Sequence, residues 1–253
     1  MSAAFVKSEI KNGIAEVTFF HPQSNSLPGE ILMQLAAAIE AAGKNPDAKV
    51  ILLRSEGEKA FCAGASFDEL VAIKNLDEGK KFFSGFAAVI NAMRKAPKFV
   101  IARVQGRAVG GGVGLACAAD YTYAVDTASV KLSELAVGIG PFVVGPAVER
   151  KVGTAAFCQM SINATEWHSA EWAREKGMYA ELFADVSTMD QAIETLLVKL
   201  ASSNPDAMLA LKKVFWEGTD HWDTLLLTRA GISGELVLSE FTRKAIERFK
   251  MKN

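Results

Sequence analysis

The stretch that decides the fold is Val104-Gln105-Gly106-Arg107-Ala108-Val109-Gly110-Gly111-Gly112-Val113-Gly114-Leu115-Ala116-Cys117. The apolar run from Phe99 to Val104 predicts a buried strand, and the small apolar residues Leu115 to Ala119 predict a closely packed helix. Three consecutive glycines lose much backbone entropy on folding, which indicates unusual dihedrals or a ligand lying against the backbone. An N–H at this junction would favour developing negative charge. The alternative is a glycine-rich turn with a packing role alone.

Length and charge exclude several functional classes. The chain has 253 residues, half of them apolar, which suits one large domain or a domain with an appendage. A net charge of −1 argues against nucleic-acid binding. The apolar runs are too short to cross a bilayer, and the N-terminal residues lack the apolar core of a signal peptide. We therefore expect a cytoplasmic protein with no nucleic-acid or membrane partner.

Cysteine and histidine show no pattern that indicates a metal site or a nucleophile. The three cysteines are widely spaced, which favours reduced core thiols over a disulfide framework. The three histidines have no metal-ligand spacing with one another or with a cysteine. We therefore expect no bound metal, and structural roles for these side chains, which are Cys62, Cys117, Cys158, His21, His168 and His221.

The N-terminal part of the chain predicts a strand, strand, helix, strand order. Alternating apolar residues over Phe5 to Ile10 and Ile14 to Phe20 flank Asn12-Gly13, a strong hairpin signal. Ser26 is expected to cap a helix, because residues of helical spacing follow it. The apolar run Val50 to Leu53 predicts a buried strand.

A second strand-to-helix loop runs from Gly57 to Leu70. Ser66 followed three residues later by Glu69 is a capping-box pattern, so the N–H of Ala65 is expected just outside a helix N-terminus. The geometry inferred at Gly110 to Gly112 is thereby repeated. Two such turns can each supply one N–H to a single oxygen, which is the arrangement of an oxyanion hole.

The rest of the chain changes from mixed to mainly helical character. Asp77 is expected to cap a helix that runs to about Lys95, and Glu134 is a single carboxylate among apolar neighbours. The apolar positions of the helical tail favour either oligomer contacts or packing on the chain's own core. Helices are predicted over 145–152, 154–160, 169–176, 188–201, 205–217 and 222–249, and strands over 121–125 and 178–183.

Several motifs together resemble the crotonase, or enoyl-CoA hydratase/isomerase, superfamily. The resemblance covers almost the whole chain in the right order, and its motifs are specific for the superfamily rather than for one reaction. The matching stretches are His21-Pro22 with Asn25-Ser26-Leu27, Ala60-Phe61-Cys62-Ala63-Gly64-Ala65, Gly106 with Gly110-Gly111-Gly112, Asp120-Tyr121, Leu132-Ser133-Glu134-Leu135 with Gly138, and Ala164 with Ala170-Glu171 and Gly177.

The resemblance implies an α/β protein with the ClpP/crotonase fold, a spiral of ββα units. It assigns residues 1–195 to a spiral core with a CoA-thioester site and 196–253 to a C-terminal helical region that forms a trimer or a dimer of trimers. Members bind an acyl-CoA, so CoA enters with the substrate and no separate cofactor is expected. The family's enolate-stabilising N–H groups correspond to Ala65 and Gly111. The residues that match its substrate-binding and CoA-binding positions are Ala63, Ala65, Ser66, Phe67, Asp68, Gly111, Gly114 and Phe142.

The sequence departs from the family pattern at its acidic residues. Hydratases typically carry glutamates at the positions of Gly114 and Glu134, and some relatives carry an acid at the position of Phe142. Glu134 is therefore the only motif-matched acid/base, and an apolar pocket would raise its pKa, although a surface carboxylate is the simpler alternative. Ser66 replaces the usual aspartate, which preserves the helix cap but not a CoA contact through that aspartate.

Three functions stay open. The pattern around Gly114 and Glu134 is similar to bacterial hydratases of the 3-methylglutaconyl-CoA type, which favours hydration of a straight or branched 2-enoyl-CoA in fatty-acid metabolism. A Δ3,Δ2-enoyl-CoA isomerase would use the same glutamate for both proton transfers. The third possibility is a crotonase-fold protein that binds acyl-CoA without turnover. Phe67, Leu70, Phe83, Phe86 and Phe142 either shape the acyl pocket or belong to the ordinary core.

Overall fold

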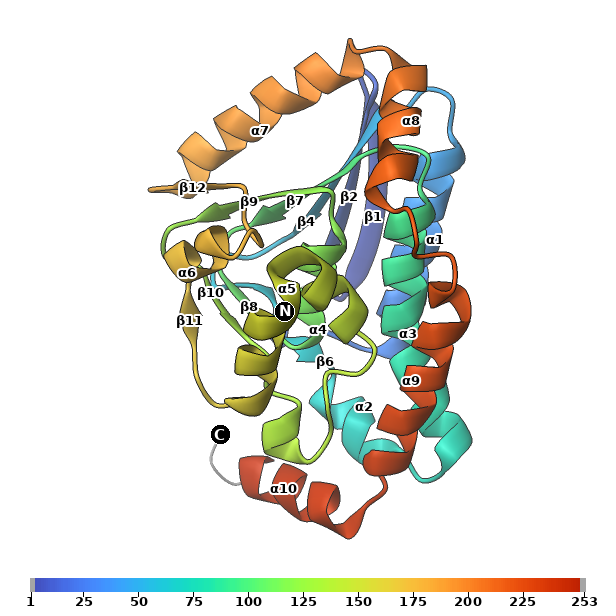
Figure 1. The fold of residues 1–253 in the computed structure, drawn as a ribbon, viewed down its shortest axis with the longest axis vertical. Helices are drawn as coiled ribbons and strands as arrows, with labels where there is room; N and C mark the ends of the chain where they lie inside the picture. Colours follow the sequence, from blue (N-terminus) through green and yellow to red (C-terminus); the bar gives the residue numbers. More distant parts are fainter. Residues whose placement is uncertain (1–2, 251–253) are drawn as a thin grey trace.

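Pairs of consecutive strands are divided between sheets in the computed structural model, which describes residues 3–250 (Figure 1). In the four pairs that begin at Ile14, Val50, Val100 and Tyr121, the first strand enters a six-stranded sheet and the second enters a smaller sheet, before a helix follows. The expected α/β class and its repeated ββα unit are thus present. The large sheet has the order β1 (Phe5–Lys11), β2 (Ile14–Phe20), β4 (Val50–Ser55), β7 (Val100–Val104), β9 (Tyr121–Val125), β12 (Glu181–Phe183).

The large sheet is parallel except for its first hairpin. β1 and β2 pair antiparallel from Phe5 opposite Phe20 to Lys11 opposite Ile14. The connecting residues Asn12 and Gly13 have φ angles of 52° and 80°, as a hairpin turn of this kind requires, so the predicted hairpin is confirmed.

The smaller sheets contain strands of two or three residues that the sequence did not reveal. Such strands are too short to show an alternating pattern, and they form because distant segments pair. The four-stranded sheet has the order β11 (His168–Ser169), β10 (Ser129–Lys131), β8 (Arg107–Val109), β5 (Ala60–Cys62), and the two-stranded sheet pairs β3 (Ser26–Leu27) with β6 (Gly64–Ala65).

The structure corrects three helix predictions. Ser26 caps no helix, because it belongs to β3 and pairs there with Gly64 of β6. Helix α1 begins at Gly29, and the N–H of Gly29 donates to Glu69 Oε2 at 2.7 Å. Asn75, not Asp77, caps the long helix by accepting from the N–H of Glu78 at 2.9 Å. The predicted helix 222–249 is two helices. The helices are α1 (Gly29–Lys44), α2 (Phe67–Ala72), α3 (Leu76–Lys95), α4 (Gly111–Ala118), α5 (Gly145–Ile162), α6 (Ala170–Glu175), α7 (Val186–Ala201), α8 (Pro205–Phe215), α9 (Trp222–Leu236) and α10 (Glu240–Lys250), with a 3₁₀ turn at Leu135–Val137.

Helix α9 packs along α3 of the same chain (Figure 1). At one end of the pair Arg94 and Asp223 form an ion pair of 2.6 Å. At the other end the backbones of Gly79 and Gly234 are so close that a Cβ at position 79 would lie 2.8 Å from the Cα of Gly234. For α9, the structure therefore shows packing on the chain's own core. The boundary expected between residues 195 and 196 lies inside the continuous helix α7.

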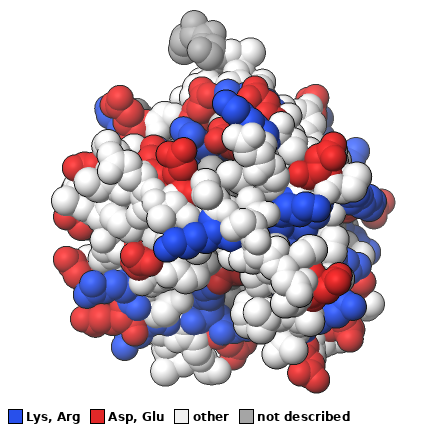
Figure 2. Space-filling model, turned by 90° about the horizontal axis from the view of Figure 1, so that it is seen from above, with Lys and Arg blue, Asp and Glu red and all other residues white. Residues whose placement is uncertain are grey.

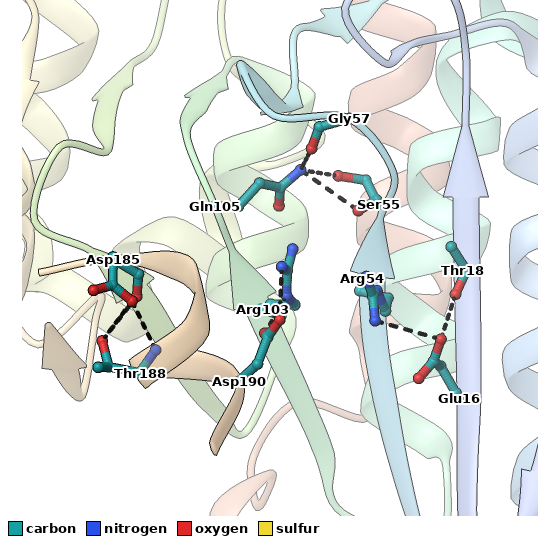
Figure 3. Close-up of polar contacts among 10 residues, drawn as sticks. All are labelled: Glu16, Thr18, Arg54, Ser55, Gly57, Arg103, Gln105, Asp185, Thr188 and Asp190. Carbon is teal, nitrogen blue, oxygen red and sulfur yellow. Dashed lines mark hydrogen bonds and ion pairs between the residues drawn. The ribbon is translucent and has the colours of Figure 1, made fainter. Parts of the chain in front are cut away.

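A bidentate ion pair between Arg103 and Asp190 attaches helix α7 to the large sheet. The guanidinium of Arg103 on β7 donates to both carboxylate oxygens of Asp190 at 2.5 and 3.0 Å (Figure 3). Arg54, opposite Arg103 in the sheet, lies 3.7 Å from Glu16. Each of these neighbouring arginines therefore has a carboxylate that offsets the repulsion between them.

Helix α8 is attached to the core by a buried carboxylate. Asp120 accepts from Lys212 Nζ at 2.6 Å, from Trp216 Nε1 at 2.7 Å and from the N–H of Val100 at 2.7 Å. The side chains of Asp120 and Lys212 are both 3% exposed. Lys212 also donates to the carbonyl of Met93 at 2.9 Å. All of these polar groups are therefore hydrogen-bonded within the core.

No helix among residues 3–250 is long and apolar enough to cross a membrane. Basic and acidic side chains are interspersed on the face of the molecule that is seen in Figure 2. That face therefore carries no extended field of one sign.

We predict that Lys212→Met lowers the free energy of unfolding by about 3 kcal/mol, because it leaves the Asp120 carboxylate buried without its cation. Urea denaturation followed by circular dichroism measures this loss. Lys213→Met is the matched control, since Lys213 is exposed on the same helix. Equal losses in the two variants would contradict the assigned role of the buried pair.

Candidate active site

The two strand-to-helix turns predicted from the sequence meet in the structure. Gly64 has a φ of 88°, and a Cβ there would lie 2.9 Å from the carbonyl oxygen of Val109 and 3.4 Å from the nitrogen of Gly111. The N–H of Ser66 donates to the carbonyl of Leu27 on β3 at 3.1 Å. Since successive N–H groups of a strand point to opposite edges, the N–H of Ala65 is directed away from β3. The edge of β6 opposite β3 thus carries the Ala65 donor.

Gly111 is the first residue of α4, which begins four residues earlier than the helix predicted from Leu115. The N–H groups in the first turn of a helix have no acceptor within the helix. Gly110 precedes it with φ 52° and ψ −113°, a conformation that residues with a Cβ rarely adopt. The N–H of Gly111 therefore lies at the positive end of a buried helix, as an oxyanion donor requires.

Packing also demands glycine in this run. A Cβ at position 111 would lie 2.1 Å from the ring of Phe86, and a Cβ at position 112 would lie 2.3 Å from the carbonyl oxygen of Cys62. The packing alternative is therefore correct for Gly112. Gly111 combines close packing with a donor position.

Glu134 lies beside the N-terminus of α4. It follows β10, whose Lys131 carbonyl accepts from the N–H of Gly110 at 2.8 Å. A Cβ on Gly110 would lie 3.0 Å from Glu134 Oε1, so the carboxyl group is next to the turn that leads to Gly111. The residue as a whole is partly exposed, whereas its Oε2 atom is buried without a hydrogen-bond partner.

Burial raises the pKa of Glu134 to about 7, because the surrounding protein disfavours the charged form. A backbone hydrogen bond within the residue opposes this shift without reversing it. A carboxyl group with a pKa near neutrality both takes up and releases protons under ordinary conditions. The structure thus gives Glu134 the environment of an acid/base and not that of a surface carboxylate.

The two turns and Glu134 open onto one apolar pocket with about 660 Å³ of empty space, its open mouth included. All five aromatic and aliphatic side chains considered for an acyl pocket line it. The lining residues are Ala63, Gly64, Ala65, Phe67, Leu70, Phe83, Phe86, Gly110, Gly111, Ser133, Glu134, Val137, Ile139, Gly140, Pro141, Phe142, Val143, Val144 and Ser233.

The position of the missing second acid is filled by another side chain. Gly114 does not line the pocket, and a Cβ there would lie 2.5 Å from Cγ1 of Val144. Val144 itself lines the pocket, and so does Phe142. Among the described lining residues, Glu134 is the only one with an acidic side chain. Gly114, which was predicted to bind substrate, therefore leaves space for the side chain of Val144, and Val144 lines the pocket.

Besides Gly114, two more of the residues expected to bind substrate or CoA, Ser66 and Asp68, do not line this pocket. Ser66 is buried and accepts from the N–H of Glu69 at 3.4 Å, which confirms its predicted capping role. Glu69 does not complete the capping box, because it binds the N–H of Gly29 instead. Asp68 is exposed and accepts from Gln23 Nε2 at 2.9 Å.

Two buried amides hold the loop before β5, and sequence analysis did not assign them a role. Asn25 Nδ2 donates to the carbonyls of Glu56 and Ala60, at 2.7 and 3.0 Å. Gln105 Nε2 donates to Ser55 Oγ at 2.9 Å and to the carbonyl of Gly57 at 3.0 Å (Figure 3). Asn25 belongs to a motif that carries the family resemblance and Gln105 to the stretch that decides the fold, but a turn residue and a core amide are indistinguishable from ligand-binding groups in sequence.

The cysteines take no part in this pocket. Cys62 and Cys117 are buried, and burial raises the pKa of each to about 12. Cys158 is exposed on α5, so the prediction of a core position is wrong for it. Among residues 3–250, no cluster of three or more His, Cys, Asp or Glu side chains is arranged to hold a metal ion.

Comparison with known families agrees with this site. The enoyl-CoA hydratase/isomerase family model matches residues 9–250. The chain belongs to the enoyl-CoA hydratase/isomerase family. Membership confirms the resemblance to the crotonase superfamily and the assignment to hydratase or isomerase enzymes.

Three similar proteins are 20–31% identical to the chain. A probable enoyl-CoA hydratase from Bacillus subtilis is 26% identical over 93% of this chain and 92% of its own length. Carnitinyl-CoA dehydratase from Salmonella enteritidis is 31% identical over 81% of this chain and 78% of its own. The crystal structure of an enoyl-CoA hydratase from Bacillus halodurans, 20% identical, superposes with a TM-score of 0.88 over 96% of this chain and 99% of that protein. The crotonase fold is therefore confirmed.

We predict that Gly114→Ala lowers the free energy of unfolding by about 1–3 kcal/mol, because the added methyl group overlaps Val144. In Gly114→Ala/Val144→Gly the two changes should cost less than the sum of the single changes, by about 1 kcal/mol, because glycine removes both Val144 atoms, Cγ1 and Cβ, that would lie 2.5 and 2.6 Å from the added methyl group. Thermal and urea unfolding of the four proteins measure this coupling. Gly231→Ala is the control, since no atom lies within 4 Å of a Cβ there; additive losses would contradict the proposed contact.

Proposed function

We propose that the protein hydrates 2-enoyl-CoA thioesters, and dehydrates the corresponding 3-hydroxyacyl-CoA, with Glu134 as its only acid/base. The observation that carries this proposal is the carboxyl of Glu134 beside the turn that opens α4, with its Oε2 atom buried and without a hydrogen-bond partner. Its pKa of about 7 suits proton transfer in both directions. Family membership and the names of the relatives support an enoyl-CoA substrate.

The N–H groups of Ala65 and Gly111 are the proposed donors to the thioester oxygen. This oxygen becomes negative when electrons from the reacting carbons move onto it. Fixed donors stabilise that charge more than they stabilise the neutral carbonyl. One such donor lowers the activation free energy by about 3 kcal/mol. Because both donors belong to the backbone, their positions depend on the glycine contacts around them and not on rotamers.

Hydration then requires two proton transfers through one carboxyl group. Ionised Glu134 takes a proton from water while the water oxygen forms a bond to C3. The π electrons of the C2–C3 bond move to the thioester oxygen and give an enolate. The protonated carboxyl next gives the same proton to C2, and the enolate returns to a thioester. Water is added overall, and Glu134 ends ionised as it began.

A second candidate is a Δ3,Δ2-enoyl-CoA isomerase. The observation that favours it is Val144, which fills the space where a second acid would lie and leaves one carboxyl in the pocket. One carboxylate is sufficient to remove a proton from C2 of a 3-enoyl-CoA and to return it to C4, which moves the double bond. The same two backbone donors would stabilise the dienolate.

We predict that Glu134→Gln lowers kcat about a hundredfold to ten-thousandfold, because glutamine fills the same space and transfers no proton. Wild type and variant are incubated with crotonyl-CoA, 3-methylglutaconyl-CoA and a 3-enoyl-CoA, and the products are identified by mass spectrometry. A gain of one water supports the hydratase, and conversion of the 3-enoyl substrate without a change of mass supports the isomerase. Binding of CoA without turnover of any substrate would contradict both and favour a binding role.

We predict that kcat/KM falls about tenfold per pH unit below a pKa of about 7 and is level above it. The sign follows from the role of Glu134 as the initial base: its raised pKa keeps the group protonated, and inactive as a base, at lower pH. Initial rates of crotonyl-CoA consumption are measured in buffers of constant ionic strength between about pH 5 and 9, a range that extends about two pH units on each side of that pKa. A rate independent of pH down to 5 would exclude Glu134 as that base.

A further inference from the structure

Successive residues of α3 show the direction in which the pocket extends away from Gly111. The ring of Phe86 packs against Gly111, at the reactive end. Phe83, nearly one turn earlier on α3, also lines the pocket. Gly79, one further turn away, packs against Gly234 of α9. A rise of about 1.5 Å per residue puts Gly79 about 10 Å along α3 from Phe86.

Ser233 of α9 lies at the end of the pocket that is remote from Gly111. It precedes Gly234, which contacts the first turn of α3, and it lines the pocket although the residue is 2% exposed. Its side chain is small, so the pocket extends to the backbone of α9. Helix α9 thus closes the acyl end of the site within its own chain.

The pocket offers no cation to a charged acyl group. None of the described lining residues is Lys, Arg or His. Arg229, one turn before Ser233 on α9, donates to the carbonyl of Phe142 at 3.4 Å and is not a lining residue. A carboxylate at the far end of an acyl group would therefore lose water without gaining an ion pair.

We propose that Ser233 sets the length of the acyl group, and that the substrate carries an uncharged aliphatic chain longer than the four carbons of crotonyl-CoA. This inference rests on the proposed function, since it assumes that the thioester oxygen lies at Ala65 and Gly111. It argues against the dicarboxylic acyl group of 3-methylglutaconyl-CoA. Selectivity arises because each methylene that enters the pocket leaves water for an apolar wall.

The first test is the chain-length profile of the wild-type protein. We expect kcat/KM to rise about fourfold per added methylene from crotonyl-CoA to 2-octenoyl-CoA. The hydratase and isomerase readouts are both recorded, with 2-enoyl and 3-enoyl substrates of each length. A flat profile, or a preference for 3-methylglutaconyl-CoA over 2-hexenoyl-CoA, would overturn the inference and leave the proposed function intact. No turnover of any substrate would overturn the proposed function instead.

The second test changes the end of the pocket. Ser233→Leu should lower kcat/KM for 2-octenoyl-CoA at least tenfold and change that for crotonyl-CoA less than twofold, because the added side chain occupies only the remote end. Ile232→Leu is the matched control and should retain the wild-type profile, because Ile232 neighbours Ser233 on α9 but is exposed and does not line the pocket. Equal losses on both substrates in a folded Ser233→Leu protein would contradict the role of Ser233. Should that variant not fold, Phe83→Ala, which widens the same end, is expected to move the optimum to longer chains; an unchanged optimum would overturn the inference.

Discussion

The close approach of two backbone turns is the constraint on which the site depends. A Cβ on Gly64 would lie 2.9 Å from the carbonyl oxygen of Val109 and 3.4 Å from the nitrogen of Gly111, and this close approach brings the β6 edge to the N-terminus of α4. Backbone N–H groups have few internal degrees of freedom, so donors held in this way need little reorganisation when charge develops. Short strand pairs keep the turns in place: β3 with β6, and β5 with β8.

A second constraint is the apolar surrounding of Glu134. An ionised carboxylate without a partner is costly in a buried position, so its pKa rises to about 7. The same apolar wall includes Val144, which is accommodated because residue 114 is glycine. The loss of one acid and the packing of the pocket are therefore one structural feature. Both features support the proposed chemistry with a single carboxyl.

The C-terminal helices complete the core as well as the pocket. Lys212 on α8 neutralises Asp120, while α9 is anchored on α3 by an ion pair at one end and a glycine contact at the other. These contacts join residues separated by about ninety to one hundred and fifty positions in sequence, a separation over which local patterns carry no information. The sequence could therefore suggest an apolar helical tail, but not the surface on which it packs.

The sequence by itself determined the elements with long periodic patterns, the hairpin at Asn12-Gly13, and the motifs that select Ala65, Gly111 and Glu134. These signals are local, because they depend on side-chain alternation, turn conformations and fixed spacings. Only the tertiary structure decided that Ser26 forms a strand, that Val144 packs against Gly114, and that Ser233 lines the pocket. Each of these depends on a pairing between distant segments, whose free energy exists only once the chain has folded.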